Sequence, residues 1–282
     1  MHTLRLSLRV IAEAFLRFNR DDGWAIASHI SLSVLMSMFP FIIVVTELAG
    51  FIGSGNLADE VARLIFEVWP KEVARPLTDQ IHRVLTTTRG GVLTFGAIFA
   101  IYFASSGVES LRIGLNRAYG LIEQRTFWLL RLESIGYVIV SALAFLALAF
   151  FVVLGPLIFH VAATYAPWIE PLKRHYDVAR YAIGGIVIAS SLFILHMWLP
   201  AGRRSLAIVW PGIAATLALW FLVGFLFGRY LADFAYTYVT YYAGLASAMI
   251  ALVFLYYSAW IFIFGGELNA AIARRRAQAT RL

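Results

Sequence analysis

AGLASAMIALVFLYYSAWIFIFGGELN, residues 243–269, is the stretch that decides the fold of this chain. The run from residue 245 to 264 is almost wholly apolar, and no charged side chain occurs between Asp233 and Glu267. At about 1.5 Å of rise per residue, a helix of this length crosses a hydrocarbon core of roughly 30 Å. The basic cluster Arg274–Arg276 follows, as is typical of the cytoplasmic end of a span. The stretch therefore predicts a final membrane-spanning helix that ends on the cytoplasmic side.

The composition agrees with a protein that faces lipid over much of its surface. Of the 282 residues, 61% are hydrophobic and only 14% are charged, against roughly 25% charged in an ordinary soluble domain. The net charge of +7 is explained better by basic flanks of spans than by nucleic-acid binding. The absence of cysteine excludes disulfides and thiol catalysis. We therefore expect membrane lipids, and not nucleic acid, as partners.

Five further apolar segments bring the number of predicted spans to six. The predicted limits of the spans are residues 25–50, 92–111, 135–160, 181–199, 206–227 and 245–266. Six spans place both termini on the same side of the membrane. Fourteen lysine and arginine residues flank the spans on that side and nine lie on the other, which predicts cytoplasmic termini. The fold class is thus an all-α polytopic membrane protein built as one domain.

Two amphipathic segments lie outside these spans. Residues 4–18 carry apolar side chains at helical spacing with arginines off that face, which predicts a helix lying on the inner membrane surface. A helix packed on the protein's own inner side is the alternative. Residues 56–88 carry two apolar helical stripes, which predict an extracytoplasmic helical hairpin.

Four positions are hinge candidates. Pro40 lies inside the first span, where the missing N–H predicts a kink. The apolar run of the second span ends at Ala104, so we expect the helix to break at Ser105–Gly107. Gly265 and Gly266 weaken the end of the last span in the same way.

A set of polar side chains is expected at membrane depth, toward the cytoplasmic half of the spans. Such groups are candidates for a substrate pathway, because an ionisable side chain within a span is costly unless it serves a purpose. Together they are suited to binding an anionic headgroup or relaying protons, and the alternative is that they only pair with one another for packing. Glu109, for instance, is three residues from Arg112 and is expected to pair with it. The candidates are His29, Glu109, Asn116, Arg117, Glu267 and Asn269.

Known catalytic signatures are missing from the sequence. It contains no phosphate-binding GxxxxGK[ST] loop, no HExxH and no GxSxG, and its six histidines are scattered. We therefore expect no catalytic residue, no metal site, no cofactor and no enzymatic activity.

Three motifs in order resemble the YihY / virulence factor BrkB family of bacterial inner-membrane proteins, whose older label was ribonuclease BN. The similarity covers residues 12–269 and implies six spans and a plasma-membrane location. A ribonuclease activity gains no support from the residues, because neither a metal cluster nor a soluble catalytic domain is predicted. The motifs are Met38-Phe39-Pro40, Ser105-Ser106-Gly107 with Leu115-Asn116-Arg117-Ala118-Tyr119-Gly120, and Gly265-Gly266-Glu267-Leu268-Asn269.

The leading hypothesis is a transporter or flippase-like protein for an anionic or amphiphilic envelope compound. The second is a non-transporting membrane scaffold or assembly factor, and the third is the inherited ribonuclease function. Small residues such as Gly212 and Ala215 allow close helix contacts within one chain or between copies, so a homo-oligomer stays open.

Overall fold

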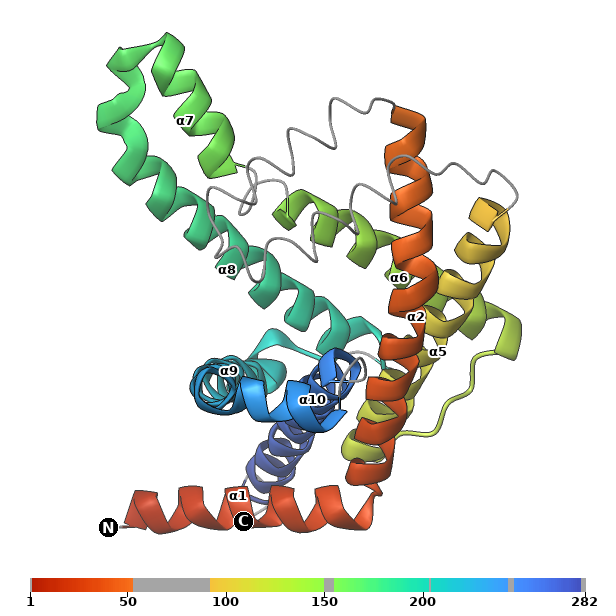
Figure 1. Cartoon of the computed structure of the whole chain (residues 1–282). Coiled ribbons are helices and arrows are strands. Elements are labelled where there is room, and N and C mark those ends of the chain that lie inside the picture. Colours follow the sequence, from red (N-terminus) through yellow and green to blue (C-terminus); the bar gives the residue numbers. More distant parts are fainter. Residues whose placement is uncertain (1, 53–91, 150–154, 203, 243–245, 280–282) are drawn as a thin grey trace. The chain divides into compact units, whose positions relative to one another are not determined.

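The computed structural model describes residues 2–52, 92–149, 155–202, 204–242 and 246–279 (Figure 1). The predicted hairpin at 56–88 lies outside these residues. Every regular element in the described part of the chain is helical. The elements are α1 (His2–Arg20), α2 (Gly23–Ile52), α5 (Val92–Tyr119), α6 (Phe127–Ala149), α7 (Gly155–Tyr165), the 3-10 helix η2 (Pro167–Leu172), α8 (Lys173–Trp198), α9 (Leu206–Tyr242) and α10 (Ala246–Ala279).

Within the described residues, six segments are long and apolar enough to cross a membrane, which confirms the all-α fold with six spans. They belong to α2, α5, α6, η2 with α8, α9 and α10. Several helices extend beyond the predicted spans. The third span begins at Phe127 and not at residue 135, and α9 continues to Tyr242. The charged side chains near the start of α6 are held in ion pairs, Arg131 with Glu109 and Glu133 with Arg125.

The helices divide into two compact units. One comprises Met1–Leu32 with Ser105–Leu282, and the other comprises Ser33–Ala104. Both α2 and α5 run from one unit into the other. Everything described below concerns the first unit, and the organisation as one domain stays a prediction.

The expected break in the second span is wrong. Helix α5 runs without interruption from Val92 to Tyr119 through Ser105–Gly107. Ser105 and Gly107 are buried, so these small residues serve close helix packing. The helix also continues through Gly265 and Gly266, because α10 ends only at Ala279. Helix α2 likewise passes through Pro40, and a hinge role for any of these positions stays a prediction.

Helices α9 and α10 lie side by side with their backbones in close approach. A Cβ atom added at Gly212 would overlap the carbonyl oxygen of Gly265, and one added at Gly265 would overlap the hydroxyl of Thr216. Only glycine permits this distance between the two helix axes. Gly265, which the sequence suggested as part of a weak helix end, is therefore a packing contact with α9.

Helix α1 packs across α10 and leaves part of its apolar surface uncovered. Ala14 and Phe18 are fully buried in that contact. Leu8, Ile11 and Phe15, on the adjoining side of the helix, remain 45–58% exposed. Packing on the protein's own surface is thus part of the arrangement, and contact of the exposed stripe with a membrane surface stays a prediction.

Candidate functional site

Asn269 of α10 completes the backbone hydrogen bonding of α9 around Pro211. Proline has no N–H, so the carbonyl of Ala207 lacks a helical donor, and Arg276 Nη1 donates to it at 3.2 Å. The Asn269 side-chain oxygen accepts the Gly212 N–H at 2.6 Å, and its NH2 group donates to the Val209 carbonyl at 2.9 Å. This fully buried side chain therefore joins two spans.

Tyr119, at the end of α5, connects Asn269 to α8. Its hydroxyl accepts a hydrogen bond from Asn269 Nδ2 at 3.3 Å and lies 3.4 Å from His196 Nδ1. The Arg204 guanidinium lies over the tyrosine ring at 4.3 Å. Burial lowers the pKa of Arg204, and Tyr119 acts in the opposite direction. Three spans and the α8–α9 turn therefore meet at one aromatic side chain.

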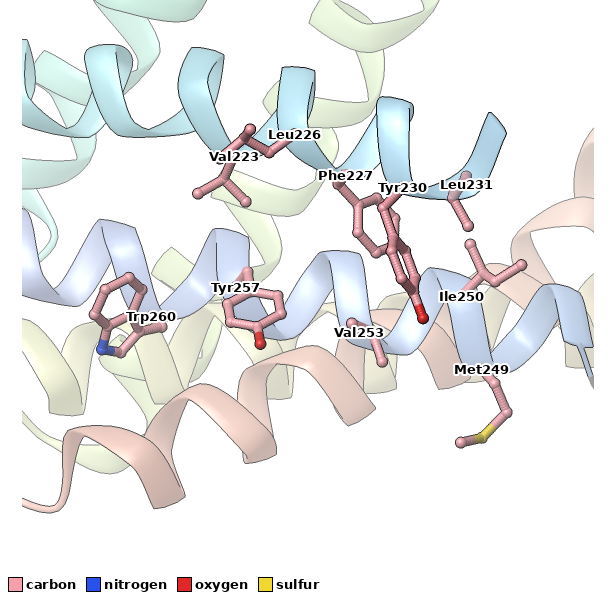
Figure 2. Close-up of a pocket in the computed structure, with 10 residues that line it drawn as sticks. All are labelled: Val223, Leu226, Phe227, Tyr230, Leu231, Met249, Ile250, Val253, Tyr257 and Trp260. Carbon is pink, nitrogen blue, oxygen red and sulfur yellow. The ribbon is translucent and has the colours of Figure 1, made fainter. Parts of the chain in front are cut away.

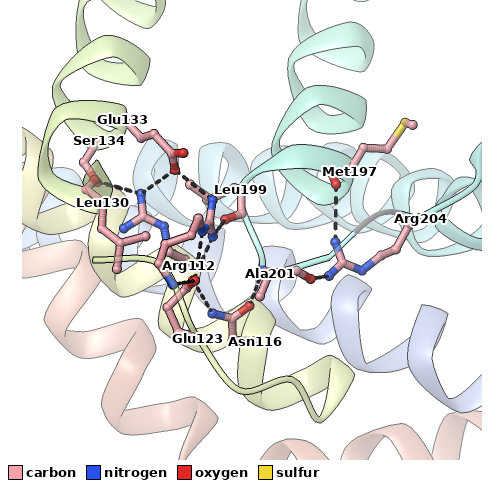
Figure 3. Close-up of polar contacts among 11 residues, drawn as sticks. Arg112, Asn116, Glu123, Leu130, Glu133, Ser134, Met197, Leu199, Ala201 and Arg204 are labelled. Carbon is pink, nitrogen blue, oxygen red and sulfur yellow. Dashed lines mark hydrogen bonds and ion pairs between the residues drawn. The ribbon is translucent and has the colours of Figure 1, made fainter. Parts of the chain in front are cut away.

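A second polar cluster joins the α5–α6 loop to the α8–α9 turn (Figure 3). Arg125 binds Glu123 at 2.7 Å and Glu133 at 2.8 Å, and it donates to the Leu199 carbonyl at 3.1 Å. Asn116 donates to Glu123 at 3.1 Å and accepts the Ala201 N–H at 2.7 Å. The hydrogen bonds from Arg125 are the main cause that lowers the pKa of Glu123 to about 2.

Arg112 extends this cluster into the interior of the helices. The side chain is 2% exposed, and its Nη2 donates to the Leu130 carbonyl at 3.1 Å and to Ser134 Oγ at 2.9 Å. Its acidic neighbour is Glu133, at 3.8 Å. The expected pairing with Glu109 is wrong, since Glu109 binds Arg131 at 2.9 Å.

An open hollow of about 320 Å³ lies between the start of α2 and the end of α5. Four of its lining residues are Asp22, His29, Ser110 and Arg117. Arg117 binds the Asp22 carboxylate at 3.0 Å, and both side chains are well exposed, at 48% and 70%. An exposed pair of this kind contributes only about 0–1 kcal/mol, so a competing anion displaces it easily.

His29 presents a ring nitrogen near this hollow. Its Nδ1 lies 2.6 Å from Ser110 Oγ, and that hydroxyl donates to the Ser106 carbonyl at 3.0 Å. Because the hydroxyl has one proton, Nδ1 carries the hydrogen in this arrangement and Nε2 is left as an acceptor.

Glu267 is buried on α10, two residues before Asn269. The residue is 1% exposed, and its Oε2 has no hydrogen-bond partner. The charged side chains that interact with it electrostatically are Asp21, which has the largest effect, Arg274 and Arg17.

A separate apolar groove of about 540 Å³ lies between α9 and α10 (Figure 2). The walls are mainly aliphatic and aromatic side chains, and polar atoms come only from Tyr230, Tyr257 and Trp260 among its lining residues. The residues that line it are Val223, Leu226, Phe227, Tyr230, Leu231, Met249, Ile250, Val253, Tyr257 and Trp260.

The sequence-predicted candidates thus have different surroundings. His29 and Arg117 share the open hollow. Asn116 and Asn269 hold helices and turns together, Glu109 forms an ion pair, and Glu267 is buried with an unpartnered oxygen. Sequence reasoning omitted Arg112, Tyr119 and His196 from the set. An arginine and a histidine inside apolar segments were the signals for two of them. No group of three or more metal-ligating side chains occurs among the described residues.

The fold and these polar contacts define a polytopic α-helical membrane protein with buried polar side chains that link its spans. The chain belongs to the family described as Virulence factor BrkB, whose model matches residues 14–282. Two relatives are similar over nearly the whole chain. "Putative ribonuclease-like protein YfkH" of Bacillus subtilis (strain 168) is 27% identical over 94% of this chain and 96% of its own length.

The second relative is "UPF0761 membrane protein RC1_0578" of Rhodospirillum centenum (strain ATCC 51521 / SW). It is 26% identical over 95% of this chain, which spans 58% of that longer protein. No solved structure matches the chain. The names of the two relatives differ, one referring to a ribonuclease and the other only to a membrane, so they do not define one activity.

Proposed function

We propose that this protein is a transporter or flippase-like protein of the bacterial inner membrane that moves an anionic, amphiphilic envelope compound. The open hollow at Arg117 is the observation that carries this proposal. It combines an arginine in an exposed ion pair with a histidine that lines the same space of about 320 Å³. We further propose that the protein is not an enzyme.

The chemistry of Arg117 suits an anionic headgroup. A guanidinium binds a phosphate or carboxylate through two parallel hydrogen bonds, and its charge is permanent. In the free protein Asp22 takes this place, with one oxygen at 3.0 Å from Arg117 Nη1. A headgroup with two acceptor oxygens replaces that single contact by a bidentate one. His29 adds a donor when its imidazole is protonated.

The apolar groove between α9 and α10 suits the hydrocarbon part of such a compound. Its lining residues lie within two spans, so the groove opens at membrane depth. An acyl chain is the apolar molecule that a bilayer supplies there. The hollow and the groove lie on different helices and are proposed as separate contacts for the two parts of an amphiphile.

The orientation is part of the proposal. Arg17 and Arg20 occur at the end of α1, and Arg274–Arg276 occur near the end of α10. Basic residues next to spans favour the cytoplasmic side, so both termini are proposed to be cytoplasmic. The hollow at Arg117 then opens toward the cytoplasmic leaflet, from which a cargo made in the cell would enter.

The test is a reconstitution in liposomes that contain a fluorescent phosphatidylglycerol analogue. The rate at which the analogue changes leaflet is measured by quenching from outside. We expect Arg117→Ala to reduce the protein-dependent rate at least tenfold and Asp22→Ala to preserve it. Arg174→Ala removes an exposed arginine at the start of α8 and is the matched control. Equal rates for wild type and Arg117→Ala would reject the site.

A scaffold or assembly role is the second candidate, and a specific observation favours it. The cluster around Arg125 joins a loop to a turn through paired groups, as a rigid structural element would. Under this function, wild-type protein would give no leaflet exchange above protein-free liposomes. A ribonuclease activity, the third candidate, would show as RNA cleavage by the purified chain that scales with its concentration.

A further inference from the structure

The α1–α2 turn is fixed against α10 by aromatic side chains. Phe18 is fully buried, and its ring lies 6.1 Å from that of Trp260 in an edge-on contact. Trp24 stacks on Trp260 at 5.7 Å with the rings 8° from parallel. Asp21 and Asp22 lie between Phe18 and Trp24 in the chain, so the turn that contains them is held at the same side of α10.

Glu267 presents a carboxyl group on that same side of α10. It follows Trp260 by seven residues, which is almost two full helical turns, so the two side chains share one face. Asp21 is thereby brought to Glu267, and the two carboxyl groups interact. Glu267 is 1% exposed, and its Oε2 has no hydrogen-bond partner.

The charged groups around Glu267 do not neutralise it. From α1 comes Arg17, from the α1–α2 turn comes Asp21, from α10 itself comes Arg274, and from α5 comes the hydroxyl of Tyr119. Both arginines bind Glu13, Arg17 at 3.6 Å and Arg274 at 3.4 Å. Two like charges at a site where one carboxyl group is buried and the other is half-buried repel each other. A single shared proton removes that repulsion and supplies the missing hydrogen bond.

We propose that Asp21 and Glu267 form a proton-binding site, and that its occupancy controls the neighbouring Asp22–Arg117 pair. Asp21 and Asp22 are consecutive residues, so a movement of Asp21 also moves Asp22. Arg117 Nη1 binds the Asp22 carboxylate at 3.0 Å and the Asp21 backbone carbonyl at 3.3 Å. When the proton leaves, two carboxylates face each other, and the turn is driven away from α10. The Arg117 contacts change with it.

This second part rests on the proposed function, because it makes the proton the coupling ion for the anion site at Arg117. A metal cation is a poorer occupant than a proton, since Arg17 and Arg274 already place positive charge around the pair. The proton is passed between carboxyl oxygens and water without any other bond being broken.

The proton site is tested by infrared difference spectroscopy of the purified full chain across pH. Wild type is expected to show the carbonyl stretch of a protonated carboxyl group at neutral pH, with a deuterium shift and with loss in alkaline solution. Glu267→Gln should abolish the band, Glu267→Asp should move it, and Asp21→Asn should shift its titration. Glu13→Gln, at a carboxylate held by arginines, should leave it unchanged. The site is overturned if the wild-type spectrum at neutral pH lacks the band, or if the band persists in Glu267→Gln.

The coupling is tested separately by binding of phosphatidylglycerol to the same preparations, measured on either side of the titration. We expect the dissociation constant to change at least fivefold in wild type and to be independent of pH in Glu267→Gln. A pH-independent constant in wild type overturns the coupling. If wild type binds no phosphatidylglycerol at any pH, the function proposed for Arg117 fails and the coupling fails with it. The infrared result still decides the proton site.

Discussion

Asn269 and Gly212 are joined by a 2.6 Å hydrogen bond from the glycine N–H to the asparagine side chain, between two membrane spans. The NH2 group of the same side chain donates to the Val209 carbonyl, so the amide oxygen and the amide nitrogen both bind the backbone of α9. A hydrogen bond within a protein typically contributes about 0.5–1.5 kcal/mol of net stability.

Asn269→Ala should therefore lower the free energy of unfolding by about 1–3 kcal/mol, because it removes two buried hydrogen bonds between α10 and the backbone of α9. Thermal or denaturant unfolding in detergent measures this. Asn269→Asp keeps the acceptor for Gly212 and loses the donor to Val209, so it should fall between wild type and the alanine variant. A stability unchanged in Asn269→Ala would contradict the structural role.

Gly212 and Gly265 should not tolerate alanine. A Cβ atom at either position overlaps atoms of the facing helix, and backbone atoms are among them, so the helices must separate. Overpacking of this kind costs about 1–3 kcal/mol or more. Gly228→Ala, in the same helix as Gly212, has open space around the added atom and should be neutral or stabilising by up to about 1 kcal/mol. Comparable unfolding temperatures for all three variants would contradict the close packing.

The Glu123–Arg125 interaction should give the protein an acid-dependent stability. In the folded state the pKa of Glu123 is lowered from 4.5 to about 2, chiefly by hydrogen bonds from Arg125. Its stabilisation is therefore fully present above pH 4.5 and is lost as pH falls from there to about 2. Unfolding temperatures measured over this range should drop less steeply in Glu123→Gln. An identical slope in the variant would show that other carboxylates dominate.

Removing Glu133 should destabilise the protein through Arg112. The glutamate lies 3.8 Å from this buried guanidinium, which then lacks an acidic neighbour at that distance. We expect Glu133→Ala to cost roughly 1–3 kcal/mol, and Arg112→Met in the same chain to recover part of the loss. Unfolding of both single variants and the double variant completes the cycle. Strictly additive losses would mean that the two residues are not coupled.

The spans were predictable because hydrophobic length alone determines them. Residues 245–264 carry that information without any tertiary contact, and α10 crosses where they predict. Helix ends were less predictable. Gly265–Gly266 and Ser105–Gly107 have the composition of a weak helix, yet their small side chains are used for close contact between helices. A local sequence pattern does not say which neighbour will fill the space beside a glycine.

The partners of polar residues were the least predictable part. Glu109 and Arg112 have the spacing of an ion pair on one helix, but each binds residues of α6, which offers a donor to Glu109 and acceptors to Arg112. Asn269 bonds the backbone at Val209 and Gly212, which are 60 and 57 residues away in sequence. Such relationships exist only after the helices have packed.

The fixed contact between α9 and α10 lies near one end of the pair, at Gly212, Gly265 and Asn269. The apolar groove begins more than ten residues further along α9, at Val223. Any change in the angle between these helices therefore has its fulcrum at the glycine contact. A small tilt about that contact widens or narrows the groove, and the displacement is greatest at Tyr230 and Met249, which lie farthest from the contact.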